Sequence, residues 1–356
     1  MSEPVGVGII GVGFGANVHL PGYQHLPGAR LLGIAASSQE RAETIASQHG
    51  IEGYGDYRRL LDRNDVKLVS IAAPAPMHHE MALAAIERGK HVICEKPFAG
   101  TLSQAEDMLR RAEASGIVHA INFEFRFTPA RQAMKALIAG GYVGQPRLTT
   151  ALATNRGRGD PNREVKSWSV RREGLGGPLG AIAVHLLDSV CWLMDAQVSS
   201  VDARLETFFP ERLVSGGERR PADAEDLVSI RLGFRGAPAL ATVDATFAAG
   251  QPMQRLEVHG SNGSLSAPDH WTLTGGQERS GMPQIQIDPK HHAAGGWRPE
   301  HGPDHLPWFA ELASRVLSRI QGESTGDYPT FHDGLRSQQL VDAILRSSDS
   351  GRTIEL

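Results

Sequence analysis

The sequence has few of the residues on which specialised architectures depend. Only two of its 356 residues are cysteines, Cys94 and Cys191, too few for a disulfide framework or a cysteine zinc site. Both stand among apolar residues, as is typical of buried thiols in a reducing compartment. Aromatic residues make up only 6%, yet 40% of residues are hydrophobic and 21% are charged. This ordinary globular composition excludes a fibrous or largely disordered protein.

Neither sign of charge is in clear excess. The 36 lysines and arginines and the 40 aspartates and glutamates give a net charge of −4, and no basic run stands out. Nucleic acid and anionic membranes attract proteins with a positive excess. No apolar stretch reaches the ~18 residues of a membrane span, and the opening residues MSEPVGVGII do not resemble a signal peptide. We expect a cytoplasmic protein with no nucleic-acid or membrane partner.

The length and the order of the hydrophobic patterns predict two domains. In residues 1–122, continuous apolar runs alternate with helical patterns, which indicates a doubly wound parallel sheet of the Rossmann type. The strands expected are Val5–Ile10, Arg30–Ala36, Lys67–Ala72, His91–Cys94 and Val118–Ile121. The helices expected between them are Gly15–Leu26, Gln39–His49, Tyr57–Asp62, Met77–Arg88 and Ser103–Ala114.

Residues 123–356 predict an α+β domain built on an open, mainly antiparallel sheet, because strand follows strand without helices between. The expected strands are Arg147–Ala153, Val201–Phe208, Leu227–Phe234, Ala239–Thr246, Arg255–His259 and Trp271–Thr274. The expected helices are Pro129–Ala139, Pro178–Met194, Pro307–Ile320 and Asp333–Ser347. We expect only the helix Pro178–Met194 to cover the sheet, so that its other face pairs in a homodimer or homotetramer. This domain is expected to bind substrate and to form the oligomer.

A glycine-rich turn, GVGFGA, follows the first expected strand. Gly11, Gly13 and Ala16 have the spacing G-x-G-x-x-G/A of a dinucleotide fingerprint. Gly11 permits the tight turn, Gly13 lets the backbone approach a pyrophosphate, and the small Ala16 lets the helix pack on the strand. The pyrophosphate would lie at the helix N-terminus. Because the turn joins a strand to a helix, dinucleotide binding is favoured over a simple loop.

The second expected strand ends without an acidic residue. Ala36, Ser37 and Ser38 stand where NAD enzymes carry an acid for the ribose hydroxyls. The two serine hydroxyls and Arg41 are suited to a ribose 2′-phosphate. The serines also fit an ordinary helix N-cap. We expect NADP to be preferred over NAD.

Two further motifs identify a family. IAAPAPMHHE follows the fourth strand, and the fifth ends in HVICEKPFAG, with Glu95–Pro97 at the carboxyl edge where ligands of such folds bind. Together with GVGFGANVH, with HLLD at His185–Asp188 and with the closing TFHDGLRSQQLVDAILRSSDSGR, they make the whole chain resemble the glucose–fructose oxidoreductase/inositol dehydrogenase (Gfo/Idh/MocA) family. The resemblance implies NAD(P)-dependent hydride transfer at a carbinol carbon of a sugar, polyol or related cyclic alcohol.

The resemblance implies that Lys96 reaches the substrate hydroxyl and the nicotinamide. A partly desolvated lysine beside a positively charged ring disfavours its ammonium form and can exchange a proton near neutral pH. The alternative is a surface lysine next to Pro97.

The family's second signature is a helix with Asp-x-x-x-His and a further Asp. Here GGPLGAIAVHLLD keeps His185 and Asp188 but has Ala181 in place of the first aspartate. Residues 181, 185 and 188 share one helix face, so the missing carboxylate would lie beside His185. The resemblance implies that His185 exchanges the substrate proton, with Asp188 as a candidate to hold its ring. A core histidine is the other interpretation.

The remaining family positions carry alternatives of their own. His78 fits a helix cap as well as the nicotinamide side, where Ala75 replaces the usual asparagine, and Arg126 fits an inter-domain ion pair. His19 fits either the family pattern or a plain surface histidine. The cofactor contacts implied are Gly11, Gly13, Phe14, Gly15, Ala16, Ser37, Ser38, Arg41, Pro74, His78, Glu95, Lys96, Asn122, Trp168 and Arg172. The substrate contacts implied are Lys96, Arg126, His185 and Asp188.

No metal is expected, because the histidines, including the pair His291–His292, lack metal-ligand spacing with carboxylates. Two rival functions remain. Some relatives use bound NAD only transiently during glycoside cleavage, and others are non-catalytic regulators that sense a dinucleotide or sugar. Ala181 favours a regulator, whereas the retained Lys96 and His185 oppose it.

Overall fold

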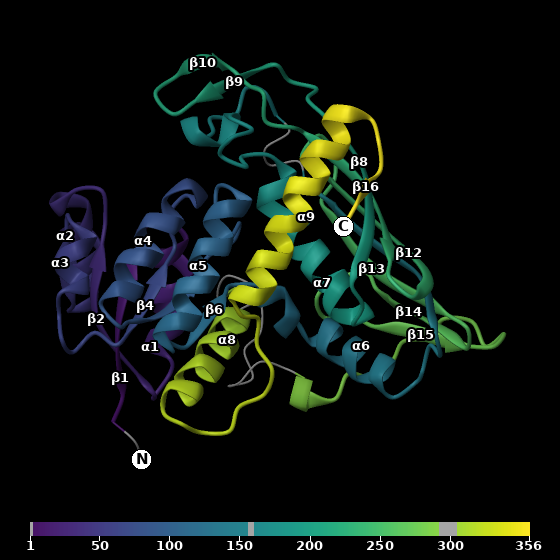
Figure 1. Ribbon diagram of the computed structural model, residues 1–356, viewed down its shortest axis with the longest axis horizontal. Helices are drawn as coiled ribbons and strands as arrows, with labels where there is room; N and C mark the ends of the chain where they lie inside the picture. Colours follow the sequence, from purple (N-terminus) through teal and green to yellow (C-terminus); the bar gives the residue numbers. More distant parts are fainter. Residues whose placement is uncertain (1–2, 156–159, 292–304) are drawn as a thin grey trace. The chain divides into compact units, whose positions relative to one another are not determined.

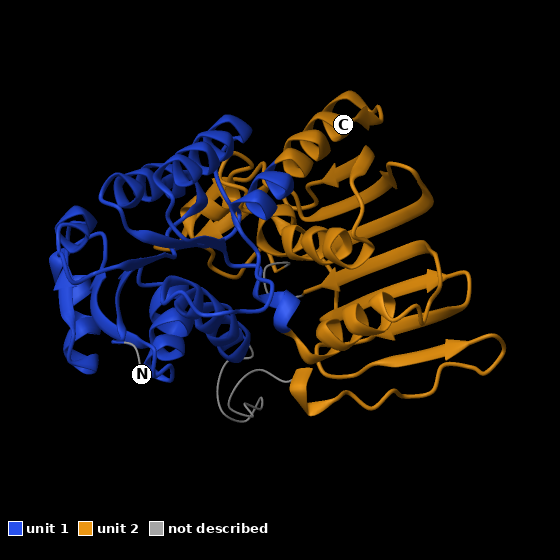
Figure 2. Ribbon diagram, turned by 60° about the horizontal axis from the view of Figure 1, so that its bottom comes forward, with its two compact units in different colours: residues 1–127, 293–338 blue, residues 128–292, 339–356 orange. Residues whose placement is uncertain are grey.

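The computed structural model describes residues 3–155, 160–291 and 305–356. The chain forms two compact units (Figure 2). Unit 1 comprises residues 1–127 and 293–338, and unit 2 comprises residues 128–292 and 339–356. The division differs from the contiguous one expected at residue 122, because the chain returns to unit 1 after building most of unit 2. Helix α9 (Phe331–Ser350) begins in unit 1 and ends in unit 2.

Unit 1 is built on a parallel six-stranded sheet of order β3-β2-β1-β4-β5-β6 (Figure 1). Its strands are β1 Val5–Ile10, β2 Ala29–Ala35, β3 Glu52–Tyr54, β4 Leu68–Ile71, β5 His91–Cys94 and β6 His119–Ile121. Every residue of β1 and β4 is buried, as expected of a sheet covered on both faces. The five strands expected from the sequence are confirmed to within one residue, and the Rossmann architecture with them. The order reverses direction at β1, which lies between β2 and β4, and ligands of such sheets bind beside this point.

The helices described in unit 1 are α1 Leu20–Gln24, α2 Gln39–His49, α3 Tyr57–Leu61, α4 Ala75–Glu87, α5 Leu102–Ser115 and α8 His305–Ile320. Three of them, α2, α3 and α5, begin at a residue whose side chain caps them. Ser38 and Thr101 accept backbone N–H groups at the starts of α2 and α5, and Gly50 and Gly116 end these helices with positive φ. The first expected helix differs, because the chain makes a π-helical turn at Gly15–His19 before α1.

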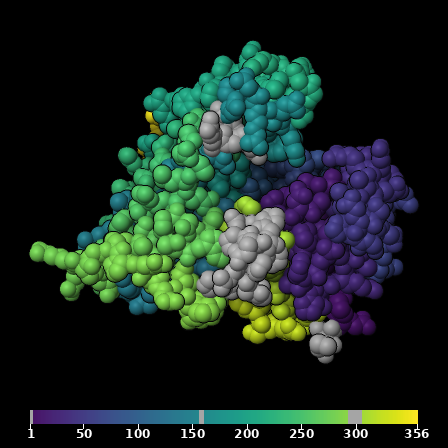
Figure 3. All heavy atoms as spheres, turned by 180° about the vertical axis from the view of Figure 1, so that it is seen from behind, coloured from purple at the N-terminus to yellow at the C-terminus, as the bar shows by residue number. Residues whose placement is uncertain are grey.

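Unit 2 contains an eight-stranded, mainly antiparallel sheet of order β15-β14-β13-β7-β12-β11-β8-β16, with one parallel pair, β7 and β12. Its strands are β7 Pro146–Thr154, β8 Val198–Glu206, β11 Leu227–Phe234, β12 Ala237–Thr246, β13 Met253–Gly260, β14 Gly263–Ala267, β15 Thr274–Gln277 and β16 Ile354–Glu355. A separate hairpin pairs β9 (Glu211–Val214) with β10 (Glu218–Pro221). The end of the sheet at β14 and β15 projects as a narrow arm in light green (Figure 3).

More than one helix lies on the large sheet. Helix α7 (Val184–Met194) contacts β7 and β12, as expected, but α6 (Pro129–Ala139) also contacts β14. The end of α9 is tied to strand β8, because Ser347 and Ser348 accept the N–H groups of Ala203 and Leu205. The sequence predicted that one helix covers the sheet, whereas at least two helices, α6 and α7, contact it.

The strand expected at Trp271–Thr274 is wrong. The carboxylate of Asp269 accepts the N–H groups of Trp271 and Thr272 at 2.7 and 2.6 Å, which turns the chain there. Strand β15 begins only at Thr274. Among the described residues, no helix is both long and apolar enough to cross a membrane.

Candidate functional site

The glycine turn after β1 has the backbone that a dinucleotide requires. Gly11 has φ +114°, and a Cβ there would lie 2.3 Å from the carbonyl oxygen of Ala72. The close packing of helix on strand falls at Gly15 rather than at Ala16, because a Cβ on Gly15 would lie 3.0 Å from the Ile9 side chain. Gly11 and Gly15 are thus required by close contacts with Ala72 and Ile9, in the strand-to-helix turn where dinucleotide folds bind a pyrophosphate.

The segment after β2 contains both features expected from the sequence, a serine that caps the next helix and a serine paired with Arg41. The Ser38 hydroxyl accepts the N–H of Arg41, so it is the N-cap of α2. The Arg41 guanidinium donates to the Ser37 hydroxyl at 2.8 Å, and both side chains are exposed. One serine is therefore used as a cap, while the other lies with Arg41 in a position open to an anion.

A buried chain of hydrogen bonds leads to the EKP motif. Glu95 is 6% exposed and His19 is fully buried, and His19 Nε2 donates to Glu95 Oε1 at 2.9 Å. On the other side of the ring, His19 Nδ1 lies 2.9 Å from the Ser70 hydroxyl, to which Tyr23 donates at 3.2 Å. Asn122 donates its amide to the same Glu95 oxygen. The surface location considered for His19 is wrong.

The charge of Glu95 is maintained despite its burial. Burial acts to raise the pKa of this carboxyl, but the hydrogen bond from His19 and the charges of His19 and Lys96 lower it overall. The backbone N–H of Lys96 lies 3.3 Å from Glu95 Oε2. A negative carboxylate therefore anchors the backbone that carries Lys96.

The Asn122 side chain, which donates to Glu95, has one oxygen atom without a hydrogen-bond donor among the described residues. Its side chain is fully buried, and its Oδ1 atom has no partner among the described residues. Because Nδ2 must donate to the Glu95 carboxylate, Oδ1 is left as an acceptor. A buried acceptor without a donor fits a ligand that carries an N–H or O–H group.

His78 binds the backbone of two loops at the carboxyl edge. It is fully buried in α4, and its two ring nitrogens lie 2.9 Å from Pro97 O and 2.7 Å from Ala73 O. Burial lowers its pKa. A neutral ring has one N–H, so it donates to one of these two carbonyls and lies against the other, and it does not cap the helix that Pro74 begins.

Arg126 is paired inside unit 1. Its guanidinium lies 2.7 Å from Asp333 Oδ1, and the arginine is 4% exposed. Asp333 also accepts Arg336 at 2.8 Å and the backbone N–H of Thr330. Both partners of this ion pair belong to unit 1.

His185 and Asp188 lie in unit 2 on the apolar helix α7. They are 2% and 3% exposed. The helix is preceded by a second π-helical turn, Leu179–Ala183, which contains Ala181. Such turns occur frequently at functional sites.

The π-helical turn that leads into α7 is held at its start by a carboxyl that no sequence pattern marked. Glu225 is 4% exposed and accepts the backbone N–H of Leu179 at 2.8 Å. Burial raises its pKa. A Cβ on Gly177 would lie 2.3 Å from the Glu225 carboxyl, which explains why the turn before the helix needs glycine.

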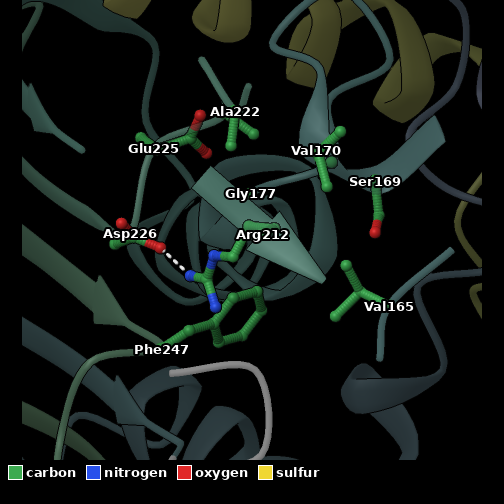
Figure 4. Close-up of a pocket in the computed structure, with 11 residues that line it drawn as sticks. Val165, Ser169, Val170, Gly177, Arg212, Ala222, Glu225, Asp226 and Phe247 are labelled. Atoms are coloured by element: carbon green, nitrogen blue, oxygen red, sulfur yellow. Dashed lines mark hydrogen bonds and ion pairs between the residues drawn. The ribbon is translucent and has the colours of Figure 1, made fainter. Parts of the chain in front are cut away.

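A small pocket lies beside Glu225 (Figure 4). Its volume of about 20 Å³ has room for one water molecule. The buried ion pair Arg212–Asp226 and Phe247 line it. The Arg212 Cζ atom lies over the ring of Phe209, 4.8 Å from its centre. Asp226 also accepts the N–H groups of Phe208 and Phe209. These contacts fix the segment that carries Glu225.

The two remaining expected contacts lie on the surface of unit 2. Trp168 is 39% exposed. The Arg172 guanidinium lies 2.8 Å from Asp349 of α9. Within the described ranges, no group of three or more histidine, cysteine, aspartate or glutamate side chains is arranged for a metal ion, and His292 lies outside these ranges.

Comparisons with known proteins agree with this architecture. Residues 5–123 match the family described as "Oxidoreductase family, NAD-binding Rossmann fold", and residues 131–266 match the "GFO/IDH/MocA C-terminal domain". Levoglucosan dehydrogenase of Pseudarthrobacter phenanthrenivorans is 34% identical, with 74% of this chain and 73% of that protein covered. Inositol 2-dehydrogenase of Rubrobacter xylanophilus is 26% identical, with 98% and 92% covered. A solved structure of levoglucosan dehydrogenase with NADH and levoglucosan is 29% identical, with a TM-score of 0.89 over 99% of both chains.

Proposed function

Because this chain belongs to the GFO/IDH/MocA oxidoreductase family, we propose that it oxidises a carbinol carbon of a sugar or cyclic polyol and that Lys96 takes the hydroxyl proton. It is an NAD-binding oxidoreductase of the sugar and polyol dehydrogenase type. The observation that carries the assignment of Lys96 is the buried, negatively charged Glu95 that anchors its backbone at the carboxyl end of β5.

The residues of unit 1 fit the cofactor. The turn at Gly11 would cradle the pyrophosphate, and the acceptor on Asn122 would receive a donor group. The cofactor, when bound, supplies the acceptor or donor of a hydride. Lys96 in unit 1 and His185 in unit 2 are the residues proposed to exchange the hydroxyl proton. Arg126, Asp188, Trp168 and Arg172 stay predictions as ligand contacts.

The test of this function begins with a panel of sugars, polyols and cyclic alcohols, with the absorbance of NADH or NADPH followed on the purified protein. The variant Lys96→Met should lose roughly 10²–10⁴-fold in kcat, as removal of a proton-transfer partner typically does. Its affinity for reduced cofactor, measured by fluorescence, should change little. A variant with wild-type turnover would contradict the role of Lys96. Glycoside cleavage without net NADH would favour the transient-oxidation rival, and cofactor binding without any turnover would favour a regulator.

We further propose that NADP is preferred over NAD, because Ala36 and the pair Ser37–Arg41 leave no negative charge at the ribose end. Ala36→Asp should weaken NADPH binding selectively, because a like-charge contact in a partly desolvated site costs on the order of several kcal/mol. Both reduced cofactors are titrated against wild type and variant by nicotinamide fluorescence. A tenfold preference of wild type for NADH, or an unchanged ratio in the variant, would contradict the proposal. A solved relative, levoglucosan dehydrogenase, contains NADH, so a preference for NADPH would distinguish this chain from that relative.

We also propose that the outward face of the unit 2 sheet forms a homodimer or homotetramer. Leu240 and Leu148 are paired in register on neighbouring strands and are 50% and 39% exposed, and Met253 on the next strand is 46% exposed. Exposed apolar side chains on adjacent strands favour association. A cytoplasmic location stays a prediction.

A further inference from the structure

His19 has no part in the function proposed above, although it contacts the EKP motif directly. It is the last residue of the π-helical turn Gly15–His19, which begins within the glycine turn after β1. Its buried ring lies between Ser70 of β4 and Glu95, with Nδ1 2.9 Å from the Ser70 hydroxyl and Nε2 2.9 Å from Glu95 Oε1. Helix α1 supplies the next group, because the Tyr23 phenol donates to the same Ser70 hydroxyl at 3.2 Å. Four buried side chains thus form one line of hydrogen bonds.

The hydrogen bonds around His19 determine which of its ring nitrogens carries the proton. The charged carboxylate of Glu95 can only accept, so His19 Nε2 carries the proton of that bond. Because Tyr23 donates to Ser70, the Ser70 hydroxyl has its own proton to donate to His19 Nδ1. The reverse direction, from Nδ1 through Ser70 to Tyr23, would leave the buried phenolic proton without an acceptor among the described residues. All three bonds therefore point toward Glu95.

Two aromatic rings hold the imidazole of His19 in this orientation. Phe309 of α8 stacks on it, with ring centres 4.0 Å apart and planes within 4° of parallel. Phe14, in the glycine turn, meets it edge to face, with ring centres 5.6 Å apart. The donor to Glu95 is therefore held by packing as well as by hydrogen bonds, which is what precise positioning of a catalytic group requires.

His19 supplies one of three hydrogen bonds to the Glu95 carboxylate. His19 Nε2 and Asn122 Nδ2 donate to Oε1, and the backbone N–H of Lys96 lies 3.3 Å from Oε2. A carboxylate that is only 6% exposed stays charged when such donors replace the water that it has lost. A further proton on the imidazole, bound at Nδ1 in acid, would break the bond from Ser70 and add a positive charge beside Glu95.

We propose that His19 is a positioning residue for Lys96: oriented by Ser70 and Tyr23, it donates a fixed hydrogen bond that keeps Glu95 charged and in contact with the Lys96 backbone. The proposal rests on the proposed function, in which Lys96 takes the hydroxyl proton. His19 passes on no proton and touches no substrate. Its effect reaches Lys96 through Glu95, which holds the backbone of Lys96 and attracts its ammonium form.

The other titratable groups around Glu95 and Lys96 do not obscure this effect. They are Tyr23, His78, Cys94 and His305 with its partner Glu124. Burial raises the pKa of Tyr23 and Cys94 and lowers the pKa of His78, so these three groups are uncharged at neutral pH. Burial acts to lower the pKa of His305, but Glu124 raises it overall. All of them are common to wild type and to a His19 variant.

The test compares His19→Leu with His19→Gln on an alcohol that the enzyme accepts. Leucine cannot donate to Glu95, whereas the glutamine amide can donate in place of the ring and does not titrate. In His19→Leu, kcat should fall roughly 10–100-fold, as misplacement of a catalytic group does. The ascending limb of its kcat–pH profile should move to lower pH, because Lys96 loses a charged neighbour. His19→Gln should recover most of kcat and keep the limb in place.

The matched control is His91→Leu, which removes another histidine at the opposite end of β5, where its ring accepts the N–H of Val118 at 3.0 Å. It should keep the kcat and the pH profile of wild type even where it lowers stability. A folded His19→Leu protein with wild-type kcat and pH profile would overturn the proposal. A His19→Gln protein as slow as His19→Leu would also overturn it, because His19 would then act other than as a donor.

A measurement without substrate separates this proposal from the proposed function. Heteronuclear NMR of protein with isotope-labelled histidine, assigned by the signal that His19→Gln removes, should show His19 as the Nε2–H tautomer near neutral pH. The same tautomer is expected in Lys96→Met. An Nδ1–H tautomer or an imidazolium would overturn the role of His19 alone, whereas wild-type turnover of Lys96→Met would overturn the proposed role of Lys96.

Discussion

His119, at the start of β6, has a ring that unit 1 keeps neutral. Its Nδ1 atom accepts the N–H of Phe331 at 3.1 Å, and its ring stacks on the Phe331 ring. Burial, and then the charge of the neighbouring His332, lowers the pKa of His119 from 6.5 to about 4. Between pH 4 and pH 6.5, His119 therefore binds a proton in the unfolded chain but not in the folded chain. The free energy of unfolding should therefore fall as the pH drops through this window.

The variant His119→Asn tests this linkage, because an amide oxygen can accept the Phe331 N–H without titrating. Urea unfolding of both proteins is measured at pH 7 and at pH 4.5. Wild type should lose about 1–2 kcal/mol more than the variant over this range, a value discounted for the partial exposure of the ring. Parallel losses would contradict the lowered pKa. Carboxylates that titrate in the same range are common to both proteins and cancel.

At the scale of single residues, the sequence indicated which residues to examine better than it indicated their burial and their hydrogen-bond partners. EKP and HLLD were enough to single out Glu95, Lys96 and His185, because local motifs carry them. The burial of His19 was not predictable, since its partners, Ser70 and Glu95, lie 51 and 76 residues away along the chain. No local pattern marked Glu124 and His305 as a pair, because 181 residues separate them.

At the scale of elements, the helix that carries His185 depends on one distant carboxyl. The first N–H groups of a helix have no partner within it, and Glu225 accepts that of buried Leu179. Glu225→Ala should cost about 1–3 kcal/mol of unfolding free energy by leaving this donor unsatisfied. It should also lower kcat by moving the helix start. Glu225→Gln keeps an acceptor of the same shape and is the matched control.

Urea unfolding and steady-state kinetics of both variants check this expectation. If Glu225→Ala is as stable and as active as Glu225→Gln, the hydrogen bond to Leu179 does not hold the helix start. If both variants fail equally, the carboxylate charge matters more than the acceptor.

Elements were predictable where burial imposed a simple pattern. The continuous apolar runs of β1 and β5 matched the sequence prediction residue for residue. The edge strand β3, with the sequence EGY, and the charged hairpin β9–β10 carry no such pattern and were missed. At Trp271–Thr274 an alternation of apolar and polar residues indicated a strand, but the side chain of Asp269 imposed a turn.

At the scale of the whole molecule, we expect the outward face of the unit 2 sheet to mediate the proposed assembly. The double variant Leu148→Lys, Leu240→Lys places charges on the paired leucines. We expect it to shift the protein from an oligomer to a monomer in light scattering coupled to size-exclusion chromatography. Phe208→Lys, which charges an exposed aromatic residue outside these strands, should leave the mass unchanged. A monomeric wild type would contradict the proposal.

The discontinuous build of unit 1 has a consequence for synthesis on the ribosome. Helix α8 supplies Phe309, which stacks on His19 with ring centres 4.0 Å apart. The Phe309 ring also packs directly against Gly22, where a Cβ would lie 2.7 Å from it. Residues 1–127 emerge roughly 200 residues before the end of the segment that completes unit 1 at residue 338. At about 5–20 residues per second, this delay lasts on the order of 10–40 s. During that interval α1 and the π-helical turn before it lack the cover of α8, so the chain offers chaperones an apolar surface that the finished protein no longer exposes.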